Sequence, residues 1–120
     1  MKIAMTLKHA VLWIDHHHAS VHSTGEQATP VRHVKAHAHP TAQHGSEVRS
    51  EHELFGEVCD ALEAVEAALV AGSKTALADF RHYVEKHRPQ TGRHIASYQT
   101  VEHLSDRQLV ALGRDFFDRP

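Results

Sequence analysis

Histidine is the residue type that gives this chain its most distinctive chemistry. It occupies 14 of the 120 positions, and a neutral imidazole is a good ligand for zinc, nickel and copper. An imidazole also takes up a proton with an ordinary pKa of about 6.5, so mild acidification would make the chain cationic. Metal binding and contact with an anionic partner are therefore to be weighed against plain solvation of these side chains.

The densest histidine run lies between the third expected strand and the first expected helix. Alternate residues of a strand share a face, so His33, His37 and His39 are predicted to project from one side. His44 in the next loop and His52 near the helix start could complete a tetrahedral or tetragonal set, and His22 could approach His33 if the strand register allows. Imidazoles alone do not distinguish Zn, Ni and Cu. The predicted metal ligands are His33, His37, His39 and His44.

Strands and a turn-rich loop account for the first 49 residues. The compact apolar run of residues 9–15, rich in Val, Ile and Trp, is too short for a helix and predicts a buried strand. Two further strands are expected at about 19–24 and 31–38, which makes a three-stranded meander. Residues 40–49 have no apolar periodicity and contain Pro, Gly, Ser and Thr, so a loop is predicted there.

Helix-starting residues precede three apolar stripes in the rest of the chain. The segments 50–53 and 105–108 match capping boxes, and a serine at position 73 is placed to cap the middle helix. The predicted N-caps are Ser50, Ser73 and Ser105. Each stripe has helical spacing and predicts a buried face: Leu54, Val58, Ala61, Leu62 and Val65; then Leu77, Phe80 and Val84; then Leu109, Leu112 and Phe116.

Short strands at 67–71 and 94–98 alternate with these helices. The second helix should end before Arg88, because a proline follows that residue. The expected order is therefore β-β-β-α-β-α-β-α, with three strands in a meander followed by alternating helices and strands. This pattern predicts an α/β fold with a mixed sheet.

The order resembles that of a ribonuclease-H-like sheet. The segments that carry the resemblance are 10–15, 69–73, Phe80, 101–103 and the helix from Ser105. They resemble the middle domain of class-1 peptide-chain release factors and of Pelota, in the fold group called translational machinery components. The chain is also similar to small bacterial translational machinery proteins that consist of this domain alone. The resemblance implies one domain over 1–120, with its core at about 9–118.

The resemblance also implies where a catalytic residue would lie. Release factors carry Gly-Gly-Gln between the third strand and the first helix, where this chain has Pro-Thr-Ala-Gln at 40–43. Gln43 lies in the corresponding loop, but the two glycines whose torsions allow close approach to RNA are absent. Hydrolysis of peptidyl-tRNA or a related ester by Gln43 is thus a third hypothesis, after RNA binding and metal binding, and a non-catalytic protein is expected.

Contact with the ribosome, tRNA or rRNA is the function that the resemblance favours. A formal charge of −2 gives no global attraction to RNA, so any contact must be local. The histidine-rich loop 37–49 and a basic edge near Arg88 are the expected surfaces, and the free amides after Ser73 could hold a phosphate. The predicted contact residues are His37, His39, Gln43, His44, Arg49, Lys74, Arg88 and Arg93.

Other classes of function are disfavoured. A two-metal nuclease needs converging carboxylates, but Asp15 is predicted to be a turn residue and Glu51 a helix-surface charge, and the strand at 67–71 ends without a carboxylate. No apolar run approaches the roughly 20 residues that span a bilayer. Cys59 is the single cysteine, so it cannot form an internal disulfide. It is predicted to be a small core residue, in a protein that is cytoplasmic.

Overall fold

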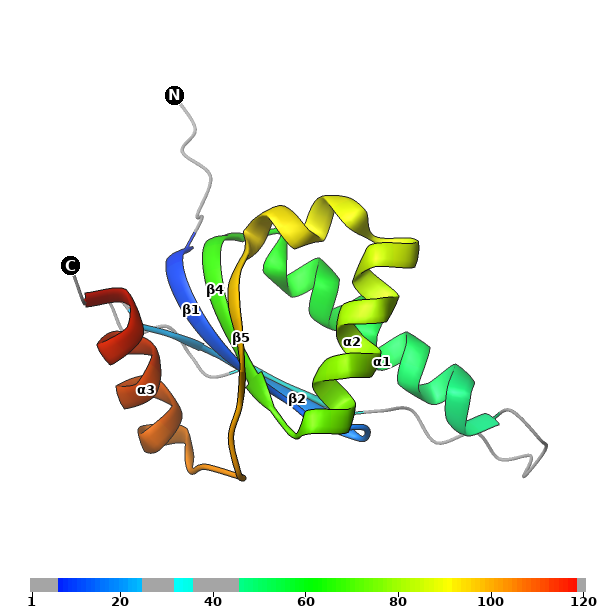
Figure 1. Ribbon diagram of the computed structural model, residues 1–120, viewed down its shortest axis with the longest axis horizontal. Helices are drawn as coiled ribbons and strands as arrows, with labels where there is room; N and C mark the ends of the chain where they lie inside the picture. Colours follow the sequence, from blue (N-terminus) through cyan, green and yellow to red (C-terminus); the bar gives the residue numbers. More distant parts are fainter. Residues whose placement is uncertain (1–6, 25–31, 36–45, 119–120) are drawn as a thin grey trace.

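The computed structural model describes residues 7–24, 32–35 and 46–118. Within these ranges, five strands form one sheet in the order β3-β2-β1-β4-β5 (Figure 1). The strands are β1 (Leu7–Ile14), β2 (His18–Ser23), β3 (Arg32–Lys35), β4 (Val65–Gly72) and β5 (Ile95–Thr100). The helices are α1 (Ser46–Leu62), α2 (Lys74–His87) and α3 (Asp106–Asp118), with a 3-10 helix, η1 (Pro89–His94), before β5. The predicted α/β class and order of elements are confirmed.

The sheet is mixed because its two halves are connected differently. β1, β2 and β3 form an antiparallel meander, as predicted. β4 pairs with β1, and β5 with β4, in parallel. β1 lies in the middle, with residues 10–14 buried on both faces of the sheet, which explains its uninterrupted apolar run. At the end of β4, Gly72 lies opposite Ile14, where a Cβ would collide with the Ile14 carbonyl oxygen.

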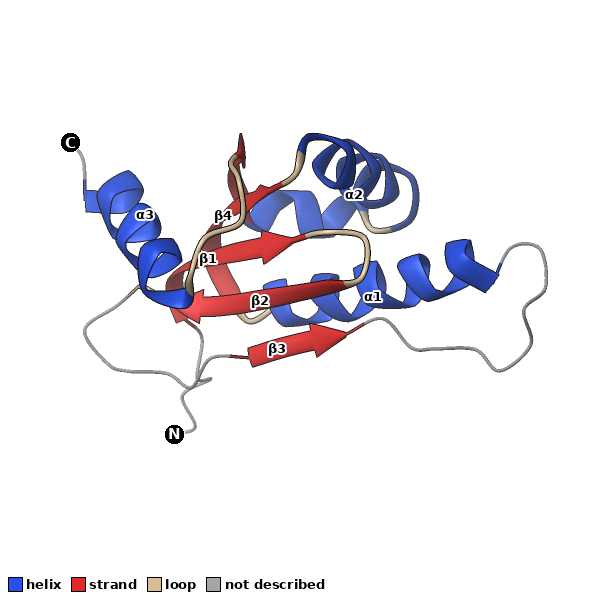
Figure 2. Cartoon of the chain, turned by 90° about the horizontal axis from the view of Figure 1, so that it is seen from below, coloured by secondary structure: helices blue, strands red, loops and turns tan. Residues whose placement is uncertain are grey.

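Helices cover both faces of the sheet. α1 and α2 lie on one face and α3 lies on the other (Figure 1, Figure 2). The face under α1 and α2 has the larger apolar cluster, which includes Leu12, Phe55 and Phe80, whereas α3 covers a smaller cluster around Trp13 and Leu109. No helix in the described part of the chain has both the length and the apolarity that crossing a membrane requires.

Two of the three predicted N-caps are confirmed. The Ser73 Oγ accepts a hydrogen bond from the Ala76 N–H at 3.4 Å at the start of α2. At the start of α3, the Ser105 Oγ accepts from the Gln108 N–H at 3.2 Å, and the Gln108 Oε1 accepts from the Ser105 N–H at 2.9 Å. This reciprocal pair is the capping box that the spacing predicted.

The predicted start of α1 is wrong. The helix begins at Ser46, so Ser50 lies inside it and residues 46–49, which were predicted to be loop, are helical. Glu47 and Arg49 have high helix propensity, which favours extending the helix back to the earlier serine. Arg49 is consequently a helix residue. β3 is described only for Arg32–Lys35, and residues 36–45 lie outside the described residues.

The prediction that Phe116 belongs to the buried face of α3 is wrong. Phe116 is 37% exposed, and Phe117 packs on the smaller cluster instead, with its ring stacked on His9 at 4.1 Å. The reason is the tight approach at Gly113, where a Cβ would lie 2.8 Å from the Val11 Cβ. The buried face therefore follows a spacing of four residues from Leu109 through Gly113 to Phe117.

Candidate functional site

The turn between β1 and β2 directs histidines toward the helices. The Asp15 Oδ1 accepts hydrogen bonds from the backbone N–H groups of His17 and His18, at 2.7 and 2.8 Å. The Asp15 N–H donates to the His18 carbonyl oxygen at 3.0 Å. Asp15 is therefore the turn residue that the sequence predicted. The closed turn holds His16 against α1 and α2.

His16 brings together one carboxylate from each of these helices. Its Nε2 lies 3.0 Å from the Asp79 Oδ2 and 3.7 Å from the Glu51 Oε2. Burial raises the pKa of Glu51; His16 acts to lower it, and the Asp79 carboxylate acts to raise it again. Glu51 is half-buried, so the expectation of a plain helix-surface charge missed its contact with His16. The arrangement places two carboxylates around a single imidazole.

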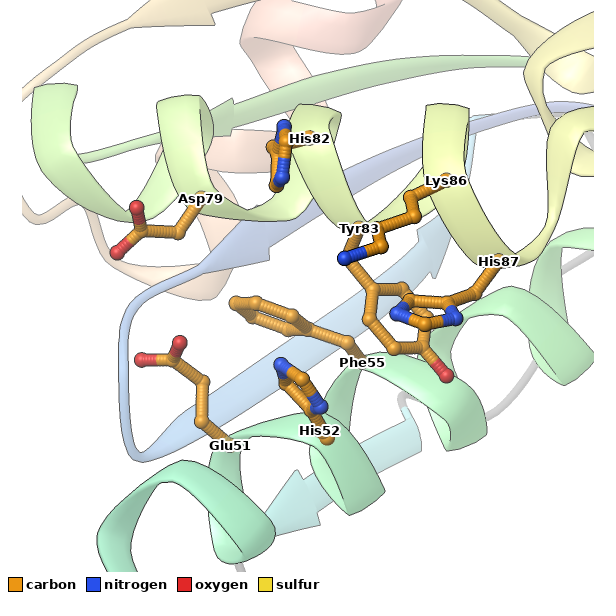
Figure 3. A pocket seen from close by; sticks show the side chains of 8 residues that line it. All are labelled: Glu51, His52, Phe55, Asp79, His82, Tyr83, Lys86 and His87. Carbon is orange, nitrogen blue, oxygen red and sulfur yellow. The ribbon is translucent and has the colours of Figure 1, made fainter. Parts of the chain in front are cut away.

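A pocket of about 260 Å³ adjoins this cluster between α1 and α2. Figure 3 shows the Glu51 and Asp79 carboxylates at one end of the pocket, with aromatic and imidazole rings along it. The Tyr83 ring centroid lies 5.3 Å from that of His52 and 5.0 Å from that of His87. The full lining is Glu51, His52, Phe55, Asp79, His82, Tyr83, Lys86 and His87. Its groups can bind metals, donate hydrogen bonds and stack on flat ligands.

The opposite face of the sheet holds a second polar group, beneath the start of α3. The His22 Nε2 lies 3.0 Å from the Ser20 Oγ and 3.6 Å from the Asp106 Oδ1, and the His33 ring is 6.4 Å from the His22 ring. The predicted approach of His22 to His33 is confirmed. Burial lowers the pKa of His22; Asp106 acts to raise it and His33 to lower it.

This second group is not a catalytic triad, although it contains Ser, His and Asp. In a triad, the serine and the carboxylate contact opposite nitrogens of the imidazole. Here Ser20 and Asp106 both face the Nε2 of His22. The His22 Nδ1 has no hydrogen-bond partner among the described residues, and Ser20 is only 3% exposed. The group therefore has no accessible nucleophile.

The predicted RNA-contact cations do not form one patch. Lys74 and Arg88 lie at opposite ends of α2, which a helix of this length separates by about 20 Å. The Arg88 guanidinium donates to the Asp60 Oδ1 at 2.8 Å, so it is engaged in an ion pair. Arg93 is exposed in η1. Arg49 lies in α1, apart from all three in the chain.

Most of the predicted histidine-rich site falls outside the described residues. Of the proposed metal ligands, His33 is an exposed residue of β3, 3.7 Å from the Asp106 carboxylate. His37, His39 and His44 lie in 36–45, as does the proposed catalytic residue Gln43. The metal set and the loop contact therefore stay predictions.

Sequence reasoning missed the cluster of His16, Glu51 and Asp79. His16 and Asp79 are 63 residues apart in the chain, so no local spacing marks them as partners. The available signal was the position of three consecutive histidines in a turn at the end of a buried strand. The turn after β1 lies at the same end of the sheet as the turn from the parallel strand β4 into α2, so histidines in it can meet side chains of that helix.

The described elements define a mixed α/β fold with helices on both faces of one sheet. A solved structure with this fold is that of Pelota from Archaeoglobus fulgidus. It matches with a TM-score of 0.58 and 17% sequence identity, over 89% of this chain and 30% of the Pelota chain. This chain thus spans less than a third of that Pelota. No protein-family model matches the sequence, and no curated protein does.

Proposed function

We propose that this protein is a translation-associated accessory domain that binds the ribosome or RNA. The observation that carries the proposal is the fold similarity to part of Pelota over 89% of the chain. This fold similarity and the motif resemblance to the release-factor middle domain and to the stand-alone bacterial translational machinery proteins favour the same class of function. The finer assignment to the ribonuclease-H-like group of translational machinery components, as one domain over 1–120, belongs to the same proposal.

The proposed contact combines the segment 37–49 with exposed cations on the α1–α2 side of the sheet. α1 begins within this segment, at Ser46, so the contact adjoins the helical layer. Lys74 and Arg93 are exposed and can reach a phosphate from the solvent. Arg88 would first have to leave Asp60. A local set of this size predicts weak binding with a shallow salt dependence, because the slope grows with the number of phosphates contacted.

Co-sedimentation with ribosomes tests the proposal. Untagged protein should pellet with ribosomes from its native cell at low salt and be released as salt rises, because phosphate contacts displace counterions. Replacement of His37, His39 and His44 together by Gln should reduce the pelleted fraction severalfold. A protein that stays wholly in the supernatant at low salt would overturn the proposal.

A charge-matched pair of variants tests which face makes the contact. Lys74→Gln with Arg93→Gln removes two cations on the α1–α2 side, and Arg107→Gln with Arg114→Gln removes two from α3 on the other face. Only the first double variant should pellet less. Equal losses for both would contradict the proposed surface and indicate a nonspecific effect of net charge.

A further inference from the structure

We infer that His16, Glu51 and Asp79 form a binding site for a divalent first-row metal ion. Their nitrogen and oxygen ligand atoms all lie within 4.8 Å of one another. Among the described residues, no other group of three His, Cys, Asp or Glu side chains is so arranged. This site differs from the histidine set predicted from the sequence, with which it shares no residue.

The spacing of the three groups fits a metal ion between them. Ligand atoms bound at about 2.0–2.1 Å in a tetrahedral site lie about 3.3 Å from one another. The His16 Nε2 is 3.0 Å from the Asp79 oxygen and 3.7 Å from the Glu51 oxygen, on either side of that value. The Glu51 and Asp79 oxygens lie within 4.8 Å of each other, so small rotations of these two side chains would bring all three ligand atoms to the spacing of a metal site.

The charge of the cluster also favours a cation. The carboxylates of Glu51 and Asp79 both face the single imidazole of His16. An ordinary ion pair would match one carboxylate to one cation, but here Glu51 is a second acid beside the pair of His16 and Asp79. A divalent ion would neutralise both carboxylates and make the imidazole a ligand.

The neighbouring pocket gives the bound metal an open side. Glu51 and Asp79 belong to both the cluster and the pocket, and Figure 3 shows their carboxylates at its end. A metal held by three protein ligands keeps further positions for water or another oxygen ligand. His52 and His82, which also line the pocket, can hydrogen-bond such a ligand. The site is thus built for a metal that binds a small ligand, which a structural metal would not do.

The donor set separates this site from the many other histidines of the chain. Oxygen ligands suit Mn²⁺, whereas sites made of imidazole alone prefer Zn²⁺, Ni²⁺ and Cu²⁺. Substoichiometric Mn²⁺ is therefore the probe. Added to ¹⁵N-labelled, untagged protein, it should broaden the amide NMR signals of residues 15–18, 50–53 and 78–81 first, because its paramagnetic effect falls steeply with distance.

Paired variants decide between a metal site and a simple ion pair. Glu51→Gln with Asp79→Asn should weaken Mn²⁺ binding at least about tenfold and abolish the localised broadening. The control is His33→Gln with Asp106→Asn, which removes a histidine and an aspartate that lie 3.7 Å apart outside the proposed site. It should leave both the Mn²⁺ affinity and the localised broadening unchanged. An unchanged amide spectrum without metal confirms that each variant is folded.

Three results would overturn the inference. They are broadening centred on other residues, broadening that persists in Glu51→Gln with Asp79→Asn, and no Mn²⁺ binding by the native protein. The last would leave the cluster as an ion pair that holds the β1–β2 turn to α2. None of them bears on ribosome binding, which the pelleting experiment measures independently.

Discussion

Replacing Gly113 by alanine measures how closely α3 packs on the sheet. Gly113 is a buried position of α3. A Cβ there would lie 2.6 Å from the Thr24 Cγ2 and 2.8 Å from the Val11 Cβ. The threonine methyl is the end of a side chain and can rotate. Val11 is fully buried in the central strand, so its Cβ moves only if the backbone moves.

Two opposing effects set the size of the change. Helix propensity alone favours alanine over glycine by about 1 kcal/mol. Inserting a methyl group into a packed interface costs about 1–3 kcal/mol, and the rigid contact with Val11 indicates the upper part of that range. Gly113→Ala should therefore lower the free energy of unfolding by about 1–2 kcal/mol, against the direction of helix propensity.

Urea unfolding followed by circular dichroism measures this difference. Ala111→Gly is the control, because Ala111 is exposed on the same helix. It should lower the free energy of unfolding by about 1 kcal/mol through propensity alone. If Gly113→Ala instead stabilises the protein by that amount, α3 does not approach β1 as closely as the geometry states, and the explanation for the exposure of Phe116 fails with it.

Three further predictions concern other buried or capping groups. Burial raises the pKa of Cys59 to about 11, so its thiol should react with Ellman's reagent at about pH 8 only after unfolding; fast reaction of folded protein would contradict this. Burial lowers the pKa of His22. As the pH falls, the His22 imidazole is therefore protonated in the unfolded chain before it is protonated in the folded protein. Stability linked to His22 is therefore present above about pH 6.5 and lost as the pH falls toward the lower folded pKa. In urea unfolding at about pH 7.5 and pH 5.5, His22→Gln should lose less stability on acidification than the native protein, and equal losses would refute the assignment. Ser73→Ala should lower the free energy of unfolding by about 1 kcal/mol in urea, and an unchanged value would mean that the cap contributes nothing.

Local patterns were sufficient to predict the elements but not all of their ends. The β1 run, the Ser73 cap and the Ser105–Gln108 box each depend on residues within a few positions of one another, and each is confirmed. The start of α1 was wrong because Ser46 and Ser50 are equally good helix-starting residues by type. Nothing local decides between them; helix propensity over 47–49 favours the earlier one.

Side-chain partners depended on the tertiary structure. Phe116 and Phe117 are adjacent in the chain and equally apolar, and the approach of Gly113 to Val11 decides which of them is buried. His16 and Asp79 meet across 63 residues because a hairpin turn and a helix lie at the same end of the sheet. The sequence by itself determined periodicity, two of the helix caps and the order of elements along the chain, which arise from short-range hydrogen bonding and apolar spacing. Only packing of the helices onto the sheet decided which chemical groups came within bonding distance, because such contacts require the folded arrangement of distant segments.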